Sequence, residues 1–298
     1  MTVPTAASNL TPALFKRLHP KPYLERFVGE GVRPDGRPLG AQAREDDVWR
    51  DASVNIGSVS TAPSSALVRL GKTSLVCGVT LEIAPPDLAR PNEGFIIPNV
   101  DLSPLCSPIF RPGPPADEAQ VLSARLRDVL LASNVLPLSS LVIEPGKAVW
   151  VVYLDVVCLN YDGGILDAAV LAAVGALRNL TLPKAEFDVD DQQAVCERIS
   201  ETSPGTRIPL AAEPYSVTFG VFQGQLLPDP TLFESQLCTS EITVVLSAPS
   251  DASPTSLKSA PLVNIYQAGA SLENGRVTLK ECIRLARRRA ADLRKVLG

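Results

Sequence analysis

The stretch that decides the fold runs from Ala148 to Leu180 and reads "AVWVVYLDVVCLNYDGGILDAAVLAAVGALRNL". Its first part is rich in Val and Leu, as a buried β-strand is. A Gly-Gly pair follows, and the remainder is apolar nearly all round, which predicts a helix buried on every side. A buried strand that leads into a buried helix predicts a core of strands and helices packed in layers.

Further strands are predicted before and after this stretch, because Val, Ile and Leu recur with a period of two. The run "SALVRLGKTSLVCGVTLEIA" at 65–84 has Gly71-Lys72 at its middle, which is typical of a tight hairpin. The run "YSVTFGVFQGQLLPD" at 215–229 has a second hairpin signal in "FQGQL", and "SEITVVLSA" at 240–248 predicts another strand.

Helices are predicted in three other places. One or two short helices are expected in "PALFKRLHPKPYLERFVGEG" at 12–31, which prolines interrupt. The segment 116–135 has apolar residues at helical spacing: Ala119, Leu122, Leu126 and Leu130. The segment 276–298 predicts an amphipathic helix with a basic outer face and an apolar stripe of Leu279, Ile283, Ala286, Ala290, Leu293 and Leu297. Both halves have strands first and helices after, which favours an α+β or mixed α/β fold of two similar units with helices on one face of each sheet.

Composition limits the function classes. The chain has 298 residues, 45% of them hydrophobic, and a net charge of −4, so its overall field does not attract nucleic acid. The six cysteines form no CxxC pair and are expected to be reduced core thiols of an intracellular protein. His19 is the only histidine, and no apolar run is long enough for a membrane span or a secretory signal. We therefore expect no metal, no cofactor and no membrane association.

Four motifs together resemble one family. They are "VRPDGRPLG", "VNIGSVSTAPSSALVRLGKTSLVCGV", "FIIPNVDLSPLCSPIFRPGPPADEAQ" and "LNYDGGILDAAVLAAVGAL", in this order along residues 23–298. The chain resembles the RNase PH family, specifically the ring subunits of the eukaryotic RNA exosome, and among these the ribosomal-RNA-processing protein 43 type.

The resemblance implies an α+β, RNase PH-like fold with a first domain like domain 2 of ribosomal protein S5. The expected divisions are a flexible extension at 1–22, domain 1 at 23–183, a crossing linker at 184–208 and domain 2 at 209–298. It also implies a place in a six-membered ring through which single-stranded RNA passes. The implied partners are other ring subunits, S1/KH cap subunits and an associated nuclease, in the nucleus, nucleolus and cytoplasm.

Two stretches decide whether such a subunit is an enzyme. Active relatives attack RNA with inorganic phosphate, which requires a cation or hydrogen-bond donors for the anion and carboxylates for Mg²⁺ or the leaving oxygen. Their phosphate-binding turn is of the Gly-Gly-Thr-Arg-Thr type. Here Gly163 and Gly164 are retained, but Leu166 takes the place of the arginine, and Asp167 would repel the anion.

The second stretch is "DPTLFESQLCTSEITVV" at 229–245, where the catalytic aspartates of active relatives fall on Ser235 and Thr239. Neither hydroxyl is ionised at neutral pH, so the resemblance implies a non-catalytic subunit. The remaining acids of the stretch, Asp229, Glu234 and Glu241, are expected to be turn and surface carboxylates. Two alternatives stay open: an active phosphate-dependent 3′–5′ exoribonuclease whose site is formed by Asp167, Glu234 and Glu241, and a stand-alone RNA-binding module.

Three arginines are candidates for RNA contact. Arg111, in "FRPGPP", is the strongest, because a basic residue on this loop faces the pore in the family; Arg125 and Arg127 are weaker, since acidic neighbours favour surface pairing. For the basic C-terminal helix, a solvated face is favoured over an RNA stripe. The loop "GVRPDGRPLG" at 31–40 is expected at the surface, either facing RNA or another subunit or serving as a folding turn.

Overall fold

The structure is a computed structural model, and it describes residues 11–39, 48–188, 193–196, 205–250, 260–272 and 274–298. The first unit contains β1 (Ala52–Ile56), β2 (Ser64–Leu70), β3 (Thr73–Ala84), β4 (Phe95–Asp101), α3 (Asp117–Ala132), the 3₁₀ helix η1 (Leu138–Leu141), β5 (Val142–Glu144), β6 (Ala148–Asn160) and α4 (Ile165–Arg178). The second contains β11 (Ala212–Phe222), β12 (Gln225–Pro228), α5 (Leu232–Ser235), β13 (Ser240–Pro249), β14 (Leu262–Gly269) and α6 (Gly275–Leu297).

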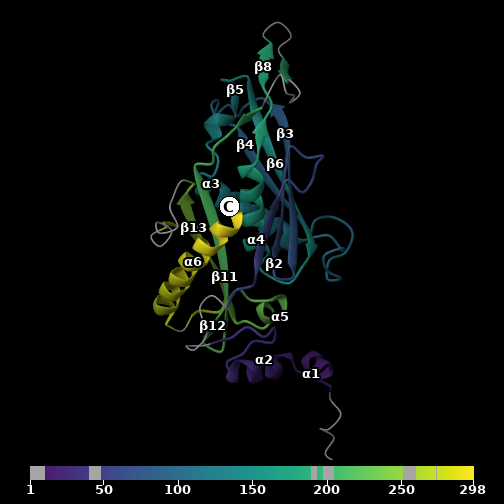
Figure 1. Cartoon of the computed structure of the whole chain (residues 1–298), viewed down its shortest axis with the longest axis vertical. Helices are drawn as coiled ribbons and strands as arrows, with labels where there is room; N and C mark the ends of the chain where they lie inside the picture. Colours follow the sequence, from purple (N-terminus) through teal and green to yellow (C-terminus); the bar gives the residue numbers. More distant parts are fainter. Residues whose placement is uncertain (1–10, 40–47, 189–192, 197–204, 251–259, 273) are drawn as a thin grey trace, which may run out of the picture.

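Each unit is built on one sheet (Figure 1). The first sheet has the order β1-β2-β3-β6-β4, with β5 paired to β6, and only β4 runs parallel to its neighbour β6. The second sheet has the order β12-β11-β13-β14 and is antiparallel throughout. Both predicted hairpins are confirmed: Gly71 (φ +58°) joins β2 to β3, and Gln223 and Gly224, both with positive φ, join β11 to β12.

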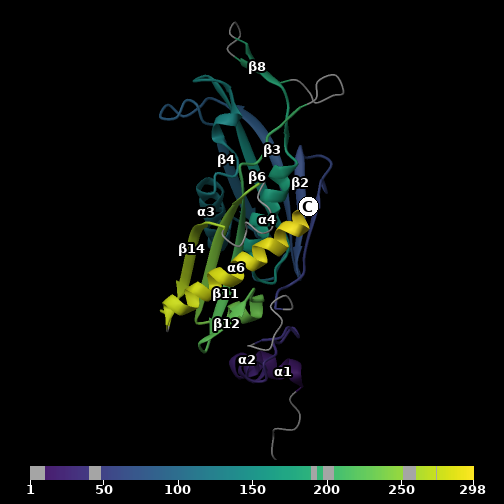
Figure 2. The ribbon, with the colours of Figure 1, turned by 60° about the vertical axis from the view of Figure 1, so that its left-hand side comes forward.

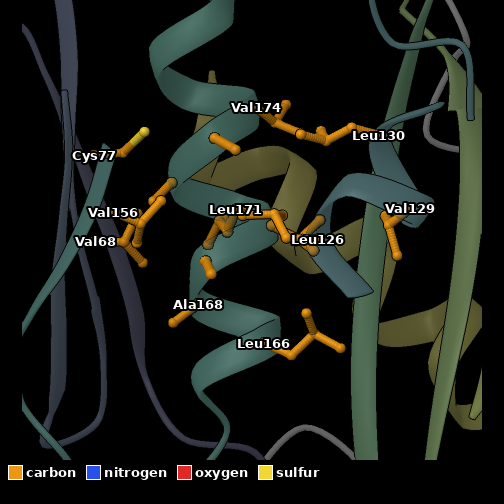
Figure 3. Close-up of a cluster of buried hydrophobic side chains, with 14 of the residues drawn as sticks. Val68, Cys77, Leu126, Val129, Leu130, Val156, Leu166, Ala168, Leu171 and Val174 are labelled. Carbon is orange, nitrogen blue, oxygen red and sulfur yellow. The ribbon is translucent and has the colours of Figure 1, made fainter. Parts of the chain in front are cut away.

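The predicted helices α3, α4 and α6 are all present. Every residue of α4 from Ile165 to Leu177 is buried, because the helix contacts β2 and β3 of the first sheet and β11 of the second. In Figure 3, side chains of α4 lie between Val68, Cys77 and Val156 of the first sheet and Leu126 of α3. Helix α6 crosses β11 and β13 (Figure 2). Helix α4 therefore packs against both sheets, and the two units share one hydrophobic core. The expectation was that each sheet would be covered by its own helices.

The segment before β1 differs from the expected flexible extension at 1–22. Helix α1 (Pro12–Leu18) lies in its second half, and α2 (Pro20–Gly29) begins within it and continues beyond it, while residues 1–10 lie outside the described part. Leu24 and Val28 of α2 pack against Phe222 and Leu227 of the second unit. Helix α2 therefore packs on the second unit, whereas no residue of α1 is buried.

The segment expected as a linker at 184–208 begins with a hairpin. β8 (Ala185–Asp188) pairs with β9 (Gln193–Cys196), and β10 (Thr206–Arg207) pairs with β7 (Thr181–Leu182). Residues 189–192, 197–204 and the Ser/Pro-rich 251–259 lie outside the described residues.

The cysteines follow the expectation only in part. Cys77, Cys106, Cys158 and Cys282 are buried free thiols, whereas Cys196 is exposed, so the prediction that all six belong to the core is wrong for that residue. The described residues contain no cluster of three or more metal-ligating side chains, and none of their helices has the length and apolarity to span a bilayer.

Candidate functional site

The turn that corresponds to the phosphate-binding turn joins β6 to α4. Gly163 and Gly164 have φ of +79° and +65°, a region that glycine enters without strain. A Cβ on Gly163 would lie 2.7 Å from the backbone nitrogen of Leu232 in the second unit. That nitrogen donates to the carbonyl of Asp162 at 3.2 Å. The glycines therefore permit close contact between the units, whether or not an anion binds.

Leu166 is the second residue of α4, two residues after Gly164. Its side chain is 5% exposed and belongs to the main hydrophobic core; Figure 3 shows it near the start of α4. The position that the resemblance assigns to a phosphate-binding arginine is therefore an interior aliphatic position in this structure.

Asp167 is also directed into the protein. One carboxylate oxygen, Oδ1, accepts from Ser216 Oγ at 2.5 Å and from Thr218 Oγ1 at 3.0 Å, and the other, Oδ2, accepts from the backbone nitrogen of Thr218 at 2.8 Å. Burial raises the pKa of Asp167 to about 6, against the hydrogen bond from Ser216, which lowers it. The carboxylate thus joins α4 to β11 and is occupied by three donors.

Arg50, two residues before β1, is the charged residue of this region that sequence reasoning missed. Its Nε lies 3.0 Å from Oδ1 of Asp229, and its Nη1 donates to the carbonyl of Asp162 at 2.8 Å. Burial opposes the charge on both partners, yet Arg50 holds the pKa of Asp229 below its usual value, and Asp229 raises that of Arg50. The cation beside the glycine turn is therefore neutralised by a carboxylate of the same chain.

A second buried pair joins Arg33 to Glu234. Arg33 is fully buried; its Nε lies 2.8 Å from Glu234 Oε1, and its Nη1 donates to the carbonyl of Pro228 at 2.6 Å. Glu234 also accepts from the backbone nitrogen of Thr231 at 2.9 Å, which completes a capping box on α5.

These pairs correct two expectations. The loop at 31–40 is not wholly a surface loop, since Arg33 is buried and Arg37 donates to the carbonyl of Asp229 at 3.0 Å. Asp229 and Glu234 are not surface carboxylates, because they are 3% and 0% exposed and paired with arginines. The turn-forming residues in these segments predicted the backbone bends correctly. They did not indicate that these side chains pair with residues about 200 positions away in the chain.

Ser235 and Thr239, the two residues that the resemblance places at the aspartate positions, form hydrogen bonds within the chain. Ser235 Oγ donates to Glu241 Oε2 at 3.0 Å, and Thr239 Oγ1 donates to the carbonyl of Val221 at 2.9 Å. Of the three acids required by the alternative of an active enzyme, Asp167 binds β11 and Glu234 binds Arg33. Glu241 accepts from Ser235. Each acid has its own partners, and no hydrogen bond or ion pair among the described residues joins the three to one another.

The three candidate RNA-contact arginines have different environments. Arg111 is exposed in the loop between β4 and α3. Arg125 is half-buried, with its guanidinium carbon 5.1 Å from the centre of the Tyr266 ring on β14, so it helps to join α3 to the second sheet. Arg127 is exposed and lines a groove of about 650 Å³ between α3 and β4.

The basic outer face expected for α6 is smaller than its sequence indicates. Arg289 turns inward: its Nη2 donates to the carbonyl of Arg50 at 2.5 Å, and its guanidinium lies 5.4 Å from the Trp49 ring. Arg294 donates to the carbonyl oxygens of Pro249 and Ser250. Arg289 and Arg294 therefore bind backbone carbonyls of other elements and do not belong to the exposed basic face of α6.

Comparison with known proteins covers both units. The model of the 3′ exoribonuclease family, domain 1, matches residues 49–183, and that of domain 2 matches residues 212–289. The chain is 39% identical to exosome complex component rrp43 of Schizosaccharomyces pombe, over 94% of this chain and 95% of that protein. It is 35% identical to exosome complex component Rrp42 of Methanopyrus kandleri, over 91% and 92% of the two chains.

Among solved structures, a chain of the Archaeoglobus fulgidus exosome with RNA bound to the active site superposes with a TM-score of 0.75. It is 28% identical, with 93% of this chain and 97% of that chain covered. The resemblance inferred from the four motifs is confirmed, and the chain belongs to the RNase PH (3′ exoribonuclease) family.

Proposed function

We propose that this chain is a non-catalytic subunit of the hexameric RNase PH-like ring of the RNA exosome. In this role it forms part of the RNA channel and binds other subunits, and so supports 3′–5′ RNA processing and degradation, including ribosomal-RNA processing and mRNA decay. The similarity to exosome components over almost the whole chain supports the assignment to the ring.

One observation carries the proposal that the subunit does no chemistry. Where active relatives have an arginine for phosphate and two aspartates, this chain has the buried Leu166 and the internally bonded hydroxyls of Ser235 and Thr239. Phosphorolysis concentrates negative charge on the attacking phosphate, the scissile phosphodiester and the departing oxygen. A leucine and two neutral hydroxyls provide neither a cation for the phosphate nor a carboxylate cage for Mg²⁺.

The nearest arginines do not replace what is missing. Arg50 and Arg33 are buried and already neutralised by Asp229 and Glu234. For phosphate to bind either guanidinium, a buried ion pair would have to break, which costs several kcal/mol. The retained acids therefore act as structural partners of arginines.

RNA contact in this proposal comes from the exposed Arg111, which would neutralise a phosphate without reading bases. Further partners are S1/KH cap subunits and an associated nuclease that degrades the RNA leaving the channel. The complex works in the nucleus, nucleolus and cytoplasm.

The test uses a reconstituted ring with end-labelled RNA and inorganic phosphate. Rings with the wild-type chain, Ser235→Ala or Thr239→Ala should release nucleoside diphosphate at the same background rate. A loss of release in either variant would favour the active-enzyme alternative. Size-exclusion chromatography of the chain alone and with ring subunits separately tests assembly, and tight RNA binding by the chain alone would instead favour a stand-alone RNA-binding module.

A further inference from the structure

The first sheet has two faces with different surroundings. Val68, Cys77 and Val156 point toward α4 and are fully buried (Figure 3). Their neighbours Leu67, Val76 and Val157 point the other way, because side chains alternate along a strand. Leu67 pairs with Val76, and Val76 pairs with Val157, so these three form one aliphatic row across β2, β3 and β6.

This aliphatic row is incompletely covered. Leu67 and Val76 are half-buried, and Val157 is 36% exposed; Leu159, next on the same strand, is 38% exposed. A row of aliphatic side chains on the middle strands of a sheet is usually covered by another layer. The described part of this chain supplies that layer on the α4 face but leaves the opposite face partly bare.

Gly78 lies beside this row at the centre of the same face, between Ser65 of β2 and Asp155 of β6. Its φ is not in the left-handed region, and a Cβ added there would meet no atom within 4 Å. Glycine inside a strand lowers stability, so it usually marks a bulge or the close approach of another backbone. No bulge is present at Gly78, and no described residue approaches it. If the backbone of another molecule packed closely against this position, only glycine would leave room for it.

The charges around Gly78 indicate the kind of molecule. Asp155 pairs directly with Gly78, and two more exposed acids, Glu82 and Asp101, lie on the same face. None of the three forms an ion pair with a described residue. Arg69, the one arginine that the described strands place on this face, lies beyond the aliphatic row, on the side away from Gly78. Three carboxylates repel a phosphate backbone but attract lysine and arginine at the rim of a protein interface.

We propose that this outer face of the first sheet docks a neighbouring protein subunit, which lays a backbone segment over Gly78. Its aliphatic side chains pack on Leu67, Val76 and Val157, and its lysine or arginine side chains lie beside Asp155 and Glu82. The inference rests on the proposed function, because the partner is taken to be another protein of the same ring.

The decisive variant is Gly78→Val, because folding and docking respond to it in opposite directions. In the chain alone, valine enters open space on a strand, so the thermal midpoint should be unchanged or higher. In a reconstitution with the purified ring subunits, the same side chain blocks the approaching backbone, and the apparent affinity should fall at least tenfold. The matched control is Gln267→Val on the exposed edge strand β14, which should leave both quantities unchanged.

A second variant tests the charge argument. Asp155→Lys should slow association with the ring subunits, and the difference from wild type should shrink as salt is raised. In a chain whose exposed Cys196 is replaced by serine, a cysteine introduced at the exposed Thr80, on the same face, should react with a maleimide more slowly in the ring than in the chain alone. Single-stranded oligoadenylate added to the chain alone should give no such protection.

The outcomes separate the two proposals. If the wild-type chain does not associate with the ring subunits at all, the proposed function fails, and this inference with it. If the wild type associates but Gly78→Val associates equally well and Thr80→Cys stays reactive in the ring, the docking surface alone is wrong. Protection of that cysteine by the oligoadenylate would identify an RNA surface and overturn the assignment to protein.

Discussion

Arg33 and Glu234 are 201 residues apart in the chain, yet they form a two-point pair in the interior, with Arg33 Nε 2.8 Å from Glu234 Oε1. Arg50 with Asp229, and Asp167 with Ser216 and Thr218, likewise connect the first unit to the second. These buried contacts around the Gly163–Gly164 turn therefore hold the two units together. In the proposed non-catalytic role, Asp167, Asp229 and Glu234 serve the fold.

Glu234→Gln tests the buried pair. The amide leaves the Arg33 guanidinium without a counter-charge at 0% exposure, and breaking a buried pair of this kind costs about 3 to 5 kcal/mol. Urea denaturation of the chain should show that loss in the free energy of unfolding. Glu93→Gln is the control, because its partner Arg90 is exposed and such pairs contribute at most about 1 kcal/mol. Equal losses in the two variants would contradict the structural role.

Leu166→Arg tests whether the phosphate site can be rebuilt by restoring one residue. Leu166 is 5% exposed in the main core, so an arginine there would be buried without a partner. A destabilisation of several kcal/mol is expected, with no gain in phosphate binding by calorimetry. Leu166→Met keeps the volume and should cost less than about 1.5 kcal/mol. A stable Leu166→Arg variant that binds phosphate would refute the interior placement.

Asp167 predicts a pH dependence. Its pKa is raised from 3.8 to about 6 in the folded protein, mainly by burial. A raised carboxyl pKa means that the folded state holds the proton more tightly, so the stability from this group is present below pH 4 and is lost as pH rises through 6. The free energy of unfolding of Asp167→Asn relative to wild type should therefore increase between pH 4 and 6, by on the order of 3 kcal/mol. Above pH 6 this difference should stay constant.

The check is urea denaturation of both proteins from pH 4 to 8. Asp229, which titrates in the opposite sense, is present in both proteins, so comparing them largely cancels its contribution. Ser216→Ala removes a hydrogen bond that lowers the pKa of Asp167. In that background, the pH range over which the Asp167 protein loses stability relative to Asp167→Asn should extend to higher pH. A difference between wild type and Asp167→Asn that does not change with pH would show that Asp167 is not shifted.

The contrast between α4 and Arg50 shows how far the sequence alone could predict this structure. The helix and the two hairpins were predictable, because residue spacing and glycine turns are local signals. That Ser235 and Thr239 carry no charge was likewise evident from residue type. Arg50 was not predictable, since it is a lone arginine before a strand and its partner Asp229 is 179 residues away. Burial of Arg33 was also not predictable, because its partner Glu234 is 201 residues away and its loop has the composition of a surface turn.

The RNA-contact arginines give the last prediction. Arg111 is exposed on a loop, whereas Arg125 lies 5.1 Å from the Tyr266 ring and is half-buried. In the reconstituted ring, Arg111→Ala should weaken binding of single-stranded RNA and reduce the slope of log affinity against log salt by about one unit or less, equally for all sequences.

Arg125→Ala should leave RNA binding unchanged but lower the stability of the chain by about 0.5 to 1 kcal/mol through loss of the cation–π contact. Fluorescence anisotropy at several salt concentrations measures the first effect, and urea denaturation the second. The reverse result, with RNA affinity sensitive to Arg125 and indifferent to Arg111, would place the RNA path along α3 and away from the loop between β4 and α3.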